Sequence, residues 1–124
     1  MKAIISGLFI IVGIIHMLPV IGVLGADRLT ALYGIPVQET NLVILMRHRA
    51  VLFGLLGLFL VYAAFKPALQ PLALIGGFIS VASFILIAYS AGGFNSEIKT
   101  VVLVDIVALV CLVLAFALRF VVRD

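Results

Sequence analysis

The sequence predicts an all-α integral membrane protein, a four-helix transmembrane bundle that forms a single domain over residues 1–124. The chain is 66% hydrophobic and only 10% charged, whereas a soluble domain has roughly 25% charged residues. Four long apolar runs cover about residues 4–24, 42–65, 71–91 and 100–121. Each is close to the about 20 residues that cross about 30 Å of hydrocarbon as a helix. The connections between the last three runs are short, so neighbouring helices should be antiparallel.

The first run follows a lysine, as a secretory signal would, but we expect it to be a retained first transmembrane helix. The loop after it contains GADRLTALYGIP, which predicts a short interfacial helix with Asp27 as its N-cap and Gly34 at its C-terminal end. Its apolar side chains Leu29, Leu32 and Tyr33 would lie at the headgroup boundary or close over the bundle as a lid.

Four spans would place both termini on the same side of the membrane. The terminal side would carry Lys2, Lys66, Arg119 and Arg123, and the opposite side Arg28 and Lys99. This excess favours termini in the cytoplasm and a site in the outer half of the bilayer. Counting the arginines of the triplet RHR at residues 47–49 with the second group removes the excess, so dual topology stays open.

The composition also excludes several classes of function. Cys111 is the only cysteine, which excludes an intrachain disulfide and any Cys-pair redox mechanism, such as that of four-helix disulfide-forming enzymes. The eight basic residues are spread among helix ends and form no basic groove, which argues against a nucleic-acid partner. We predict no metal site.

Four polar side chains fall at a similar depth, about 9–12 Å inside the outer ends of the runs at about 1.5 Å per residue. They are His16, Arg47, Ser83 and Asp105, one from each run. An ionisable group at this depth costs several kcal/mol unless it is paired, hydrated or able to snorkel. We therefore expect a shared polar site.

Helical phase distinguishes the three side chains of the RHR triplet. Residues 47, 50, 54, 57 and 61 share one face of the second run, and the small side chains among them favour close helix contact. Arg47 is therefore expected to point inward and to pair with Asp105. His48 lies to one side of that face. Arg49 lies nearly opposite, where it would snorkel to the outer headgroups.

These residues also have purely structural interpretations. An Arg47–Asp105 pair could serve stability alone, and Ser83 could pack and bond within its own helix. His16 could donate to a backbone carbonyl freed by Pro19.

We interpret Arg47, Asp105, His16, His48 and Ser83 as the lining of a pocket that binds a lipophilic small molecule or a lipid with an anionic or carbonyl group. Quinones, fatty acids and phospholipid headgroups all fit this description. Four alternatives stay open: a proton-coupled transporter using Asp105, an isomerase-type enzyme using His16 and Asp105, a haem b protein ligated by His16 and His48, and an accessory subunit of a larger membrane complex. Homo-oligomerisation also fits, because the helices have small-residue faces to spare.

Five segments carry a resemblance to a known group of proteins: LPVIGVLGADRLTALYG, LMRHRAVLFGLLG, FKPALQPLAL, SFILIAYSAGGFN and VVLVDIVALV. They resemble an uncharacterised family of small four-span bacterial membrane proteins. Some of its members are labelled phosphopantetheine adenylyltransferase, but such an enzyme needs alternating strands and helices and a His-x-Gly-His site, which this sequence lacks. The resemblance implies a bacterial inner membrane and supplies no chemistry.

Overall fold

The computed structural model describes residues 1–123 and confirms the predicted fold class. Its elements are α1 (Lys2–Met17), η1 (Leu18–Leu24), α2 (Ala26–Tyr33), α3 (Thr40–Ala64), η2 (Pro67–Leu69), α4 (Gln70–Ser90) and α5 (Ser96–Arg123). Within the described residues there is no β-strand. Four helical segments, Lys2–Leu24, Thr40–Ala64, Pro67–Ser90 and Ser96–Val122, are long and apolar enough to cross a membrane.

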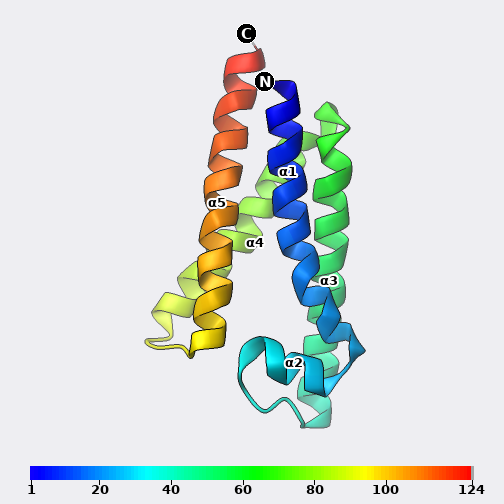
Figure 1. Cartoon of the computed structure of the whole chain (residues 1–124), viewed down its shortest axis with the longest axis vertical. Helices are drawn as coiled ribbons and strands as arrows, with labels where there is room; N and C mark the ends of the chain where they lie inside the picture. The colour runs from blue at the N-terminus through cyan, green and yellow to red at the C-terminus, as the bar shows by residue number, and fades with distance from the viewer. Residues whose placement is uncertain (124) are drawn as a thin grey trace.

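Helices α1, α3 and α5 run along the long axis of the molecule, α4 slants across behind them, and both termini lie at the same end (Figure 1). Helix α1 packs against both α3 and α5, and α4 packs against α5 and α3. The short helix α2 lies at the end opposite the termini (Figure 1). We call these two ends the terminal end and the α2 end.

The first predicted span is one α-helix followed by a seven-residue 3-10 helix, η1. The change comes at Pro19, which has no N–H to donate to the carbonyl four residues earlier. The N–H of Leu18 is shared between the carbonyls of Ile14 and Ile15, so the carbonyl of Ile15, which Pro19 cannot reach as a donor, still has a partner. The tighter η1 then leads the chain to α2.

The expected short helix in the first loop is present as α2, with a different start. Its N-cap is Gly25, and Asp27 lies inside the first turn, so the predicted N-cap was wrong by two residues. The C-terminal end matches the prediction, because Gly34 takes a left-handed conformation at φ 67°. Leu29 and Tyr33 are buried, so α2 packs onto the end of the bundle as the lid interpretation required.

A side-chain cap fixes the start of α3. The carboxylate of Glu39 accepts the backbone N–H of Leu42 at 2.8 Å. This hydrogen bond, together with those from Asn41, holds the pKa of Glu39 below its ordinary value.

Close backbone contact joins α1 to α3 across small residues. A Cβ atom built on Gly13 would lie 2.9 Å from the carbonyl oxygen of Gly57, and one built on Gly57 would lie 2.8 Å from the carbonyl oxygen of Gly13. Ala50, Gly54 and Gly57 are all buried in α3. The small-residue face predicted for this helix is therefore its contact with α1 and η1, as is usual where helices pack without a hydrophobic driving force.

Candidate functional site

A polar cluster lies between the helices near the α2 end. Arg49 follows the first residue of α3 by nine positions, and Asp105 follows the first residue of α5 by nine. Both therefore lie about 14 Å from the starts of their helices. Together with His16, Tyr33 and Phe84 they line one small cavity, so all four long helices and the short helix α2 contribute to it.

The guanidinium of Arg49 is held by aromatic side chains and one hydroxyl. Its Cζ lies 4.5 Å from the ring centre of Phe53, 5.3 Å from that of Tyr33 and 5.9 Å from that of Phe84. Its Nη1 donates to the Tyr33 hydroxyl. A bare arginine in a spanning helix costs about 2.5–3.5 kcal/mol, while each cation–π contact contributes about 0.5–2 kcal/mol. The three rings thus offset a cost of this size.

His16 is the most buried polar group of the cluster. It is 3% exposed, and both ring nitrogens are hydrogen-bonded: Nδ1 lies 2.9 Å from the carbonyl oxygen of Val12, and Nε2 lies 2.9 Å from Oγ of Ser80. The expected bond from His16 to a backbone carbonyl exists, but its partner is Val12 rather than the carbonyl that Pro19 frees. The pair with Ser80 ties α1 to α4.

Two neighbouring cavities meet at this cluster. The smaller, about 20 Å³, is bordered by His16, Tyr33, Arg49 and Asp105 and has room for one water molecule or one oxygen atom of a ligand. The larger, about 320 Å³, lies between α1, η1, α2 and α5. Both share Tyr33 and Asp105 in their lining, and Asp105 is only half-buried. The carboxylate of Asp105 and the phenol of Tyr33 therefore lie where the larger, apolar cavity meets the smaller one.

The predicted inward orientation of Arg47 is wrong, and so is the expected position of Arg49 at the headgroups. Arg47 is exposed and its Nε donates to the carbonyl oxygen of Val23 at 2.8 Å. It does lie on the small-residue face, but that face is covered by α1 and η1, and η1 ends beside it. Arg49 is half-buried and lines the same cavity as Asp105. The arginine that accompanies Asp105 is thus the other one of the triplet.

Two more predicted site residues lie outside the cluster. His48 is exposed, and neither of the two cavities includes it. Ser83 is also exposed, and its hydroxyl donates to the carbonyl of Ser80 in its own helix. The hydroxyl that α4 contributes is that of Ser80, one turn earlier, beside the ring of Phe84 from the same helix. Since His48 and His16 lie in different surroundings, the structure brings no pair of histidines together for a haem.

Sequence reasoning missed Arg49, Tyr33 and Ser80. A signal for Arg49 was present in its spacing to Phe53, because residues four apart share a helix face and an aromatic ring there can contact the guanidinium.

The fold and the cluster define a class of protein: a four-helix bundle of membrane-spanning length with an aromatic-enclosed arginine beside a carboxylate. Comparison with models of known protein families, with curated proteins and with solved structures finds no match for the chain.

Proposed function

We propose that the protein binds a lipophilic small molecule that carries a carbonyl or hydroxyl oxygen. The observation that carries this proposal is the junction of the two cavities at Tyr33 and Asp105. The larger cavity has the volume of a small-molecule site, roughly 300–1,000 Å³, and an apolar lining for the body of the ligand. The smaller cavity accepts one oxygen atom, which Arg49 would meet with its unused N–H donors.

The charges around the larger cavity select a neutral polar group. Glu97 and Asp105 both border it, so a carboxylate or phosphate would meet two like charges. A neutral oxygen can accept from Arg49, and a hydroxyl can also donate to Asp105. Quinones and long-chain alcohols therefore fit better than the fatty acids and phospholipid headgroups that the sequence also allowed.

An acid/base role for His16 is the weaker proposal. Both of its ring nitrogens already have partners within the protein, Val12 and Ser80. A proton transfer to a substrate would break one of these buried hydrogen bonds, at a cost of about 1–3 kcal/mol for the group left unpaired. We assign His16 to holding α1 against α4 beside the site.

We place the protein in a bacterial inner membrane with its termini in the cytoplasm. The family resemblance supports this placement, and so does the excess of basic residues at the terminal end when the arginines at residues 47–49 are left out of the count. The α2 end and the site would then face the outer leaflet, where a membrane-dissolved ligand enters sideways between α1 and α5.

The test uses the purified full chain in mild detergent and native mass spectrometry with three probes: decyl-substituted benzoquinone, hexadecanol and palmitate. We expect adducts with the quinone or the alcohol and a weaker one with palmitate. Ala31→Phe, which fills the larger cavity, should remove the adduct. Ala117→Phe, an equal enlargement at an exposed position outside the cavities, should leave it unchanged. Equal binding by both variants, or a preference for palmitate, would refute the proposal.

A further inference from the structure

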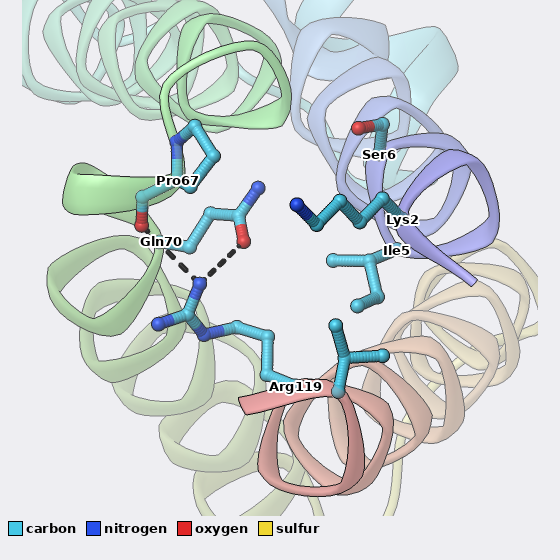
Figure 2. Close-up of a pocket in the computed structure, with 7 residues that line it drawn as sticks. Lys2, Ile5, Ser6, Pro67, Gln70 and Arg119 are labelled. Carbon is cyan, nitrogen blue, oxygen red and sulfur yellow. Dashed lines mark hydrogen bonds between the residues drawn. The ribbon is translucent and has the colours of Figure 1, made fainter. Parts of the chain in front are cut away.

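A second polar cavity lies at the terminal end, far along the bundle from the Arg49 cluster. It measures about 310 Å³ and is formed between α1, η2, α4 and α5. Figure 2 shows Arg119 reaching from α5 to the backbone of Pro67 and to Gln70, with Lys2 extending toward Gln70 from the other side. Ser6 completes the polar part of the lining.

Arg119 is fixed in this cavity by its neighbours. Its Nη1 donates to Oε1 of Gln70 at 2.7 Å and to the carbonyl oxygen of Pro67 at 3.2 Å. Gln70 is 3% exposed, and its Nε2 donates to the carbonyl oxygen of Ala63 at 3.0 Å. The guanidinium is therefore held in place by Nη1, and within residues 1–123 its Nε and Nη2 donors have no acceptor and can serve a ligand.

The charged side chains that the described residues contribute to the lining of this cavity are all cationic. Lys2 and Arg119 line it, and no carboxylate side chain belongs to its lining within residues 1–123. This contrasts with the larger cavity at the α2 end, which Glu97 and Asp105 border.

An apolar groove continues from the same arginine. It measures about 320 Å³, runs between α4 and α5, and is lined besides Arg119 by Pro71, Leu74, Ile75, Phe78, Phe116 and Phe120. Arg119 thus separates a cationic cavity from a groove of aromatic and aliphatic side chains that faces outward from the bundle. This arrangement matches an amphiphile with an anionic head and a hydrocarbon chain.

We propose that Lys2 and Arg119 bind the phosphate of an anionic phospholipid, one of whose acyl chains occupies the groove between α4 and α5. The phosphate would accept from the free donors of Arg119 and from the Lys2 ammonium. The chain would pack against Phe116 and Phe120. This site is independent of the Arg49 cluster and takes an anionic ligand, whereas the Arg49 cluster takes a neutral one.

The experiment is native mass spectrometry of the full chain in mild detergent with phosphatidylglycerol, and with phosphatidylcholine of the same acyl chains. Phosphatidylglycerol should bind more tightly. Lys2→Gln should weaken its binding about fivefold, the effect of one basic side chain at a lipid surface. Arg119→Gln should weaken it at least about tenfold, because hydrogen bonds to charged groups are lost. Lys99→Gln, a matched change at the α2 end, should have no effect.

Two further arms separate a lipid from a free phosphate. A phosphatidylglycerol with short chains should bind less tightly than the long-chain lipid, and inorganic phosphate should not displace the long-chain lipid. Equal binding of short and long chains, or displacement by inorganic phosphate, would overturn the assignment of the groove. Equal affinity for the two headgroups, or equal losses in Lys2→Gln and Lys99→Gln, would overturn the site itself. Lys2 is exposed, so its variant stays informative even if Arg119→Gln does not fold.

Discussion

Replacing Gly13 by alanine tests the close contact between α1 and α3. The added Cβ would lie 2.6 Å from Cγ2 of Val61 and 2.9 Å from the carbonyl oxygen of Gly57. The second of these neighbours is backbone and cannot rotate away. The two helices must therefore separate, and overpacking of this kind costs about 1–3 kcal/mol.

The same helix supplies the control. Gly7 is also in α1, and a Cβ there meets no atom within 4 Å, so Gly7→Ala gains helix propensity of about 1 kcal/mol and loses nothing. Gly13→Ala has the same gain and the overpacking cost. We therefore expect Gly13→Ala to be less stable than Gly7→Ala by about 1–3 kcal/mol.

The assay is reversible unfolding of the purified protein in mixed micelles by increasing amounts of a denaturing detergent, followed by circular dichroism. The free energies of unfolding of the two variants are compared under identical conditions. If Gly13→Ala is as stable as Gly7→Ala, the contact between α1 and α3 is looser than described, and the small-residue face of α3 has another role.

Three further predictions use the same unfolding assay. Gly34→Ala should lower the free energy of unfolding by roughly 1–2 kcal/mol, because an alanine at φ 67° is strained; an unchanged value would contradict the left-handed cap. The carboxylate cap of Glu39 has its pKa lowered by hydrogen bonding to backbone N–H groups, so its stabilisation is complete above the ordinary pKa of 4.5 and is lost as the pH falls through the lower folded value. Wild type should thus lose more stability on acidification below pH 4.5 than Glu39→Gln does, and parallel curves would refute this. Tyr33→Phe removes the acceptor of Arg49 and should cost about 1.5–3 kcal/mol, whereas Tyr89→Phe, at an exposed ring, should cost nearly nothing.

The architecture could be predicted because it depends on the length and hydropathy of each segment alone. A run of about 20 apolar residues has few ways to satisfy its backbone in a membrane other than a helix. Gly34 was predictable for a similar local reason, since few residues other than glycine adopt the left-handed conformation. The N-cap at Gly25 could not be predicted, because Asp27 has a side chain typical of an N-cap. Whether Gly25 or Asp27 caps α2 depends on the direction in which η1 leads the chain into the helix.

The sequence predicted how deep the site residues lie along their helices, but not which neighbouring helix each side chain faces. His16 and Asp105 do border one cavity, because depth follows from counting residues along a helix. The choice of Arg47 over Arg49 failed because helical phase gives directions relative to the helix, while the neighbour that covers each direction is set by the tertiary fold. The small-residue face of α3 was predicted correctly, but it packs against α1 and does not face the polar interior.

Ser80 and Ser83 show the same limit within one helix. They are three residues apart and share a face, but only Ser80 is level with His16 across the contact of α1 and α4. A tilt of α4 decides which of the two is level, and a tilt is set by packing rather than by composition.

The contact between Tyr33 and Arg49 has a consequence for how the chain is made. Tyr33 precedes Arg49 by 16 residues, so a ribosome delivers the hydroxyl before the charge that needs it. The first span and α2 therefore leave the ribosome before α3, and the acceptor of the guanidinium is already part of the chain when Arg49 is added. A circular permutation that placed α2 after α5 would reverse this order of arrival and leave the arginine without its partner throughout biosynthesis.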